Sequence, residues 1–127
     1  MGHILLVDDD ATLRRTLRAM LERAGYAVVE AGDGDQAMAS FIADRPDLVL
    51  TDIIMPNREG VETIRDLRAH DPSVPIIAMS GGGQTGGDLF LKIASRLGAA
   101  ATLAKPIRQA TLLALIAAHH PRPPPAG

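Results

Sequence analysis

The chain contains no cysteine and no tryptophan, and only 2% of its 127 residues are aromatic. The lack of cysteine excludes disulfide bonds and metal sites built from thiolates. The aromatic residues are Tyr26, Phe41 and Phe90, which leaves little to stack a flavin ring and makes flavin binding a poor interpretation. With 46% hydrophobic residues, the core must be aliphatic.

The sequence also lacks a charge excess and a long apolar run. Its net charge is −2 at pH 7 and its eleven arginines are dispersed. Arg14, Arg15 and Arg18 come closest to a basic face, which we interpret as a solvated helix surface. Because nucleic-acid-binding domains usually carry a clear basic excess, we expect no direct nucleic-acid binding. Without a leader segment or a bilayer-spanning run, we expect no membrane association and a cytoplasmic location.

Short apolar runs alternate with longer segments of helical period. We expect strands at His3–Val7, Ala27–Ala31, Leu48–Thr51, Pro75–Met79 and Ala99–Leu103. We expect helices over the stripe from Leu13 to Ala24, at Gln36–Ala43, around Val61–Leu67, over Leu89–Leu97 and at Ile107–Ala118. Strict alternation of this kind predicts an α/β fold with right-handed crossovers and helices on both faces of the sheet. We expect a five-stranded parallel sheet in the flavodoxin-like order 2-1-3-4-5.

The length fits one domain, which we place at residues 1–118. Residues 119–127 contain four prolines and show no apolar periodicity. We interpret this segment as a disordered tail or the start of a linker.

Acidic residues follow two of the expected strands. Asp8, Asp9 and Asp10 come after the first strand, and Asp52 comes after the third. Asp10 is also the expected N-cap of the first helix. In the predicted strand order these strands are neighbours, so their carboxylates converge at the edge where open α/β sheets bind ligands. Such a cluster repels itself unless a cation is bound, and hard oxygen ligands favour Mg²⁺.

Two further polar residues follow strands at the same edge. Ser80 comes after the fourth strand and Lys105 after the fifth. Lys105 is notable because the chain has one other lysine, Lys92, against eleven arginines. Taken singly, Asp8 to Asp10 could cap the first helix, Ser80 could cap a turn and Lys105 could be a solvated lysine. The joint placement of these residues predicts a single site.

These motifs resemble those of the receiver domains of two-component response regulators, flavodoxin-like modules that a histidine kinase phosphorylates on aspartate. The resemblance runs from about residue 3 to residue 118. Its motifs occur in the family's order and at its spacing. The matching segments are Ile4–Asp10, Leu48–Met55 with Pro56 and Gly60, Ala78–Ser80, and Lys105–Pro106.

The resemblance implies a role for each acidic residue. Asp52 would be the phosphoryl acceptor. Asp9 and Asp52 would be direct Mg²⁺ ligands together with the backbone carbonyl of Ile54, and Asp8 would hold the ion mainly through water.

The resemblance also implies how the phosphoryl group is held. Lys105 would supply a second cation, and the Ser80 hydroxyl a hydrogen bond to a phosphoryl oxygen. By the same analogy, the bond between Lys105 and Pro106 would be cis.

The implied function is a phosphorylation-dependent binding module that catalyses only phosphoryl transfer to its own aspartate, and is not a separate enzyme. The implied donor is a histidine kinase or a histidine phosphotransfer protein. The implied downstream surface is the face made by the fourth helix, the fifth strand and the fifth helix. Because the sequence ends soon after the fifth helix, we expect a single-domain regulator; the alternative is a receiver fragment of a larger regulator with a C-terminal output domain.

The chain departs from the family's pattern at Thr102, where receiver domains usually carry tyrosine or phenylalanine. Since threonine cannot fill an aromatic-sized pocket, we hypothesise that switching depends on the loop and helix after the fourth strand.

Two enzyme-like interpretations of the sequence are weaker than the receiver interpretation. The haloacid-dehalogenase type pairs its nucleophile with an aspartate two residues on, where this chain has Ile54. A G-x-G-x-x-G match at Gly81–Gly86 follows the fourth strand instead of the first, with no acidic residue after Asp88 to bind a ribose.

Overall fold

The computed structural model describes residues 3–53, 59–80, 92 and 95–120. The strands are β1 (Ile4–Val7), β2 (Val28–Ala31), β3 (Leu48–Asp52), β4 (Ile76–Ser80) and β5 (Ala101–Ala104). The helices are α1 (Ala11–Arg23), α2 (Gly34–Ala43), α3 (Glu59–His70) and α5 (Gln109–His119).

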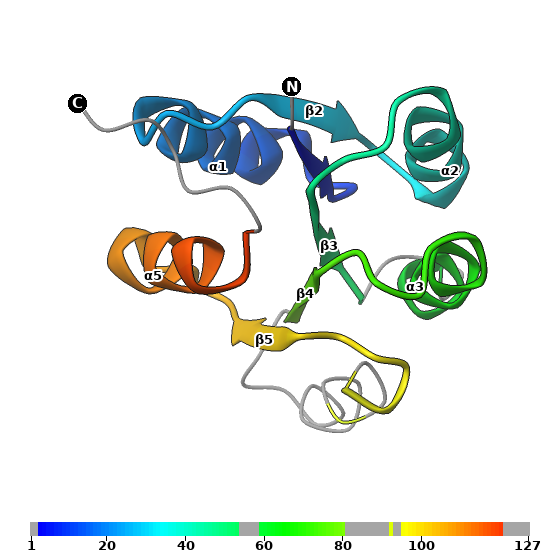
Figure 1. Cartoon of the computed structure of the whole chain (residues 1–127). Coiled ribbons are helices and arrows are strands. Elements are labelled where there is room, and N and C mark those ends of the chain that lie inside the picture. Colours follow the sequence, from blue (N-terminus) through cyan, green and yellow to red (C-terminus); the bar gives the residue numbers. More distant parts are fainter. Residues whose placement is uncertain (1–2, 54–58, 81–91, 93–94, 121–127) are drawn as a thin grey trace.

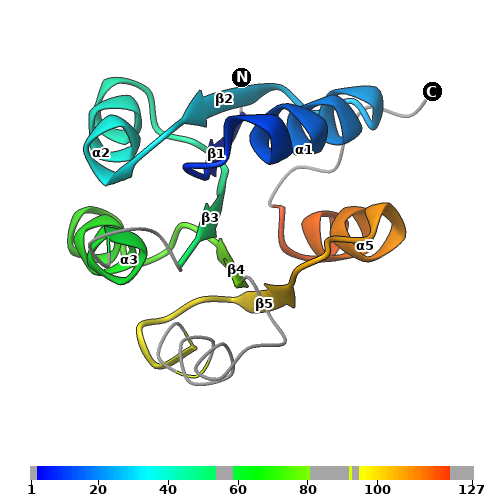
Figure 2. The ribbon, with the colours of Figure 1, turned by 180° about the vertical axis from the view of Figure 1, so that it is seen from behind.

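The five strands form one parallel sheet in the order β2-β1-β3-β4-β5, which confirms the predicted fold. In Figure 1 the sheet runs through the middle of the molecule, with α1 and α5 on one side and α2 and α3 on the other. Figure 2 shows the same layers from behind. The order makes β1 the direct neighbour of β3, as the carboxylate argument requires.

Each strand sends alternate side chains to opposite faces of the sheet, and both faces are buried. On β1, Leu5 and Val7 join the core beneath α2 and α3, while Ile4 and Leu6 join the core beneath α1 and α5. This double burial explains why β1 is an unbroken apolar run. Among the described residues, Phe41 is the largest fully buried side chain, and the core that they form is aliphatic apart from Phe41 and Tyr26.

The ends of α1 follow the sequence signals. The Asp10 side chain accepts hydrogen bonds from the backbone N–H groups of Thr12 and Leu13, which confirms Asp10 as the N-cap. Gly25, one residue past the C-cap, has φ 101°, a left-handed conformation that glycine adopts without steric cost.

Several element bounds differ from the prediction by one or two residues. β3 ends at Asp52 and β4 at Ser80. Both polar residues were predicted to follow these strands, and each is instead the last residue of its strand. The reason is that the ladder continues past them: Ile53 N–H donates to the Met79 carbonyl at 2.9 Å, and Lys105 N–H to the Ser80 carbonyl at 2.7 Å. α5 runs from Gln109 to His119, so it starts two residues later and ends one residue later than the predicted helix.

Some predicted features lie outside the described residues. These are most of the helix expected over 89–97, the glycine-rich match at 81–86, Ile54, and the tail from residue 121. Of the expected helix, Lys92, Ser95 and Arg96 are described and are helical. Among the helices of the described part of the chain, none is long and apolar enough to cross a membrane.

Candidate functional site

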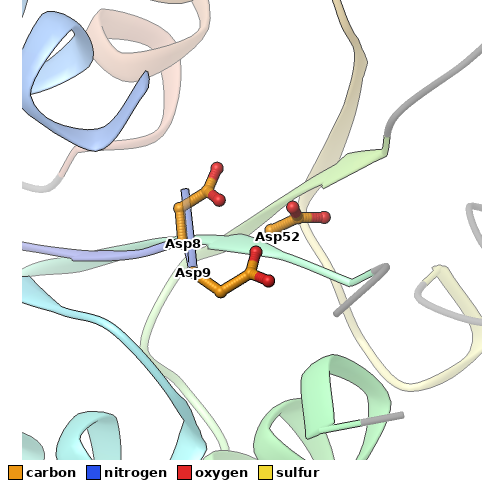
Figure 3. Close-up of side chains that lie close together, drawn as sticks. All are labelled: Asp8, Asp9 and Asp52. Atoms are coloured by element: carbon orange, nitrogen blue, oxygen red, sulfur yellow. The ribbon is translucent and has the colours of Figure 1, made fainter. Parts of the chain in front are cut away.

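Three carboxylates gather where β1 and β3 end. Val7 pairs with Thr51 across the sheet, so the next residues, Asp8 and Asp52, lie level with one another. Ligand oxygens of Asp8, Asp9 and Asp52 all lie within 4.8 Å of one another (Figure 3). Asp8 is fully buried and Asp52 is 3% exposed, whereas Asp9 is exposed. The cluster therefore reaches the surface at Asp9.

Lys105 brings a positive charge to this cluster from the end of β5. Its Nζ donates to Asp52 Oδ2 at 2.8 Å and to Asp8 Oδ2 at 3.0 Å. Burial alone would lower the pKa of Lys105, but the hydrogen bonds and charges of Asp52 and Asp8 outweigh it and raise the pKa above its ordinary value. The ammonium group thus stays charged between two buried carboxylates.

The donor set and its charge fit a divalent cation. Three carboxylates against one ammonium leave a formal charge of −2 at the cluster. All the donors are carboxylate oxygens, the ligand type that Mg²⁺ prefers. Lys105 already bridges two of the three, which shows that a cation is accommodated between Asp8 and Asp52.

Ser80 is placed beside the cluster by the sheet. It is fully buried at the end of β4, and its backbone carbonyl accepts the N–H of Lys105. The Lys105–Pro106 peptide bond is cis, as predicted. The structure therefore brings together Asp8, Asp9, Asp52 and Lys105, with Ser80 at the same edge of the sheet. Ile54 lies outside the described residues, so its carbonyl as a metal ligand stays a prediction.

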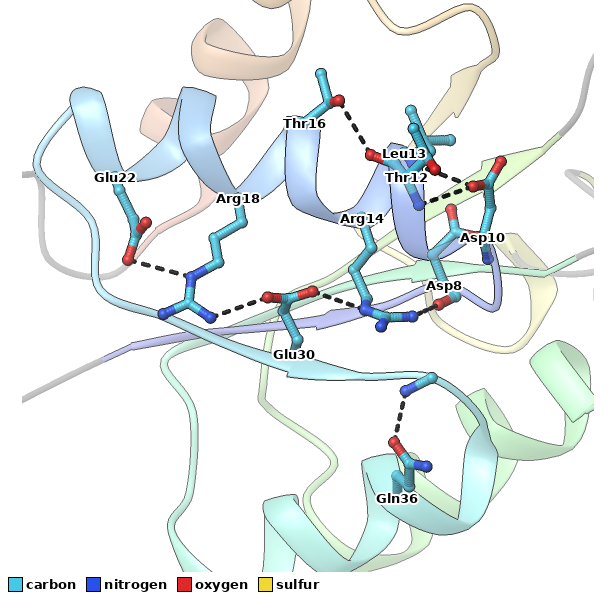
Figure 4. A network of polar contacts seen from close by, with 11 residues as sticks. Asp8, Asp10, Thr12, Leu13, Arg14, Thr16, Arg18, Glu22, Glu30 and Gln36 are labelled. Carbon is cyan, nitrogen blue, oxygen red and sulfur yellow. Dashed lines mark hydrogen bonds and ion pairs between the residues drawn. The ribbon is translucent and has the colours of Figure 1, made fainter.

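The interpretation of the arginines on α1 as a solvated face was wrong for Arg14, whose side chain is 18% exposed, whereas the Arg18 side chain forms ion pairs but stays 41% exposed. Arg14 Nε donates to Glu30 Oε1 at 2.7 Å, and Arg18 Nη1 donates to Glu30 Oε2 at 2.9 Å (Figure 4). Arg14 Nη1 also donates to the backbone carbonyl of Asp8 at 2.6 Å. Arg15 is exposed, as expected. The signal for this pairing was the lone acidic residue in the strand Val28–Ala31, opposite two arginines spaced i,i+4.

Thr102 lies on β5 opposite Ala78 and is partly buried. Together with Lys92, Ser95 and Arg96 it lines an open hollow of about 380 Å³. The hypothesis that switching does not use an aromatic side chain here stays a prediction.

Comparison with known proteins assigns the chain to a family. The chain matches the model of the response regulator receiver domain over residues 4–117. It is 37% identical over 118 residues to the transcriptional regulatory protein CpxR of Escherichia coli, a match that covers 93% of this chain and 49% of CpxR. It is 43% identical over 81 residues to the transcriptional regulatory protein ResD of Bacillus subtilis, covering 64% of this chain and 33% of ResD. The chain thus spans about half the length, or less, of these curated relatives.

Solved structures give the same assignment. The chemotaxis protein CheY4 of Vibrio cholerae superposes with a TM-score of 0.83 at 28% identity, covering 94% of this chain and 98% of that one. A response regulator of Burkholderia pseudomallei, solved with a phosphorylated aspartic acid, a calcium ion and citrate, superposes with a TM-score of 0.79 at 29% identity. That match covers 90% of this chain and 65% of the Burkholderia chain.

Proposed function

The chain belongs to the family of response regulator receiver domains, and we propose that it accepts a phosphoryl group on Asp52 in a Mg²⁺-dependent reaction. The donor is a histidine kinase or a histidine phosphotransfer protein. The observation that carries the proposal is the placement of Asp52 beside Asp8 and Asp9, with its Oδ2 held at 2.8 Å from Lys105 Nζ.

The acidic residues hold the ion in this proposal. Asp9 and Asp52 would be its direct ligands, joined by the carbonyl of Ile54, and Asp8 would act mainly through water. When bound, Mg²⁺ neutralises charge on the phosphoryl oxygens, which is the main requirement of phosphoryl transfer. The Burkholderia response regulator, with its phosphorylated aspartic acid and calcium ion, supports this combination of groups.

The transfer itself needs one nucleophile and one new bond. An oxygen of the Asp52 carboxylate forms the P–O bond while the P–N bond of the donor's phosphohistidine breaks, and the electron pair of that bond stays on the imidazole nitrogen. Lys105 then pairs with a phosphoryl oxygen, and the Ser80 hydroxyl donates a hydrogen bond to another. The chain catalyses only this transfer to its own aspartate and is not a separate enzyme.

We propose that the phosphorylated chain signals by binding a downstream protein through the face of the predicted fourth helix, β5 and α5. Neither nucleic-acid binding nor membrane contact is part of this proposal, and the cytoplasmic location stays a prediction. CpxR and ResD are transcriptional regulators at least twice as long as the matched region. A receiver joined to an output domain is therefore the alternative to a single-domain regulator, and the length of the coding sequence decides between them.

Incubation with Mg²⁺ and acetyl phosphate, followed by intact mass measurement, tests the acceptor. We expect a gain of one phosphoryl group that requires Mg²⁺ and disappears in Asp52→Asn. The matched control is Asp10→Asn, which makes the same change at the N-cap of α1. Asparagine is as good an N-cap residue as aspartate, so the helix should be kept. This variant should still be phosphorylated. A phosphoryl group retained by Asp52→Asn would refute the acceptor, and a native chain that takes none from either acetyl phosphate or a phosphorylated phosphotransfer protein would refute the function.

A further inference from the structure

Arg14, in the first turn of α1, reaches back to the loop that carries Asp8 and Asp9. Its Nη1 donates to the Asp8 carbonyl at 2.6 Å (Figure 4). The Asp8 N–H donates to the Ala31 carbonyl at 3.1 Å. Both backbone polar groups of Asp8 are therefore fixed by hydrogen bonds. Because the Asp8 carbonyl belongs to the peptide that joins Asp8 to Asp9, this bond also sets the direction in which Asp9 leaves the strand.

Glu30 on β2 fixes Arg14 in turn. Its Oε1 accepts from Arg14 Nε at 2.7 Å, and its Oε2 accepts from Arg18 Nη1 at 2.9 Å. The Arg14 and Glu30 side chains are only 18% and 21% exposed, so their pairing is partly shielded from solvent. The three side chains link α1 and β2 to the end of β1.

The two bonds of Arg14 require a guanidinium group. Nε and Nη1 of one planar group bind Glu30 and the Asp8 carbonyl at the same time, in directions that a single ammonium nitrogen does not reproduce. The position therefore selects arginine by geometry and not only by charge.

We propose that Arg14 is a positioning residue for the magnesium site: together with Glu30 it holds the Asp8–Asp9 peptide so that both carboxylates face Asp52 before the ion arrives. This inference rests on the proposed function. Arg14 acts through the backbone of Asp8, in the way that partners outside the ligand shell of a metal orient the ligands themselves.

Mg²⁺ binding to the native chain and to Arg14→Gln, measured by calorimetry, tests the proposal directly. Loss of such an orienting partner typically weakens metal binding by about 10-fold or more, so we expect the Mg²⁺ dissociation constant to rise by about 10-fold. The Mg²⁺ concentration that gives half the maximal rate of phosphorylation by acetyl phosphate should rise in parallel. The rate at saturating Mg²⁺ should stay close to native, because the reacting groups are unchanged.

The chain offers matched controls on the same helix. Arg15→Gln removes the same charge at an exposed neighbour, and Arg18→Gln removes a partner of Glu30 while leaving the bond to the Asp8 carbonyl intact. Both should bind Mg²⁺ nearly as the native chain does. Arg14→Lys restores the charge without the paired geometry and should recover the affinity only in part. If Arg14→Gln does not fold, Glu30→Gln takes its place, with a smaller shift in the same direction.

The outcomes separate the two proposals. A folded Arg14→Gln variant that binds Mg²⁺ like the native chain overturns the positioning role while the native chain is still phosphorylated. Equal weakening in Arg15→Gln also overturns it, because the effect would then be one of overall charge. A native chain that neither binds Mg²⁺ nor takes a phosphoryl group ends the proposed function and this inference with it.

Discussion

Replacing Lys105 with methionine should destabilise the chain in the absence of Mg²⁺. The change removes the ammonium group that bridges Asp8 and Asp52, which are 0% and 3% exposed, and leaves those carboxylates facing each other. Removing one partner of a buried ion pair costs about 3–5 kcal/mol. Because the Lys105 side chain is 18% exposed, solvent screens part of the interaction. We therefore expect a loss of about 2–3 kcal/mol in the free energy of unfolding.

Mg²⁺ should reverse part of this loss. Lys105 Nζ occupies Oδ2 of both aspartates, so an ion that binds these carboxylates competes with it in the native chain. Without the ammonium group the competition is gone and the ion should bind more tightly. A ligand specific for the folded state adds about 1.4 kcal/mol for each tenfold gain in affinity once it is in excess. We expect saturating Mg²⁺ to stabilise Lys105→Met by about 1–2 kcal/mol more than it stabilises the native chain.

Urea unfolding followed by far-ultraviolet circular dichroism measures both quantities, once with EDTA and once with saturating Mg²⁺. The control is Lys92→Met, which removes the chain's other lysine at an exposed position and should change stability little in either condition. If Lys105→Met loses the same stability with and without Mg²⁺, then the ion and the ammonium group do not share these carboxylates, and the electrostatic account of the site is wrong.

Two further predictions concern Glu30, which binds Arg14, and Gly98, which shortly precedes β5. The hydrogen bond from Arg18, followed by that from Arg14, lowers the pKa of Glu30 in the folded chain. The stability contributed by the charged Glu30 carboxylate is therefore present above the unfolded-state pKa, and it is lost as the pH falls through the folded-state pKa. The free energy of unfolding of Glu30→Gln should therefore be about 1 kcal/mol lower than that of the native chain at neutral pH and equal to it in acid. Urea unfolding that gives the same difference in this free energy at every pH would contradict the prediction. Gly98→Ala should lower the free energy of unfolding by about 1–2 kcal/mol, because Gly98 has φ 100° and an added Cβ would lie 2.9 Å from Arg68 Nε. An unchanged melting temperature of this variant would contradict the prediction.

The strand order and most of the site could be predicted because both depend on local patterns. A strand buried on both faces must be apolar at every position, as Ile4–Val7 is, and alternation with helices then restricts the topology. The carboxyl ends of parallel strands share one edge, so polar residues that follow those strands must converge there. The strand ends were off by one residue at Asp52 and Ser80, because the last ladder bonds depend on the neighbouring strand and not on the residue's own polarity.

The contact between Arg14 and Asp8 could not be predicted in the same way. It depends on the height of α1 above the sheet and on Glu30 facing α1, and both are set by packing between segments far apart in sequence. The charge pattern alone fits a solvated helix equally well. Arg14 and Glu30 are sixteen residues apart in the sequence. Their pairing follows only from the register of β2 beside β1, in which Leu6 is opposite Glu30.

Lys105 connects the electrostatics of the site to the fold. One ammonium group serves two carboxylates, and its own backbone N–H donates to the Ser80 carbonyl. A phosphoryl group on Asp52 carries a charge of about −1.5 to −2 in place of the −1 of the carboxylate, and it competes with Asp8 for this ammonium group. Lys105 directly follows β5, so this change in its pairing takes place next to the strand that carries Thr102 three residues earlier. Thr102 lines a hollow together with Lys92, Ser95 and Arg96 of the predicted fourth helix, so we expect the charge on Lys105 to act together with the loop and helix after β4, without an aromatic side chain at position 102.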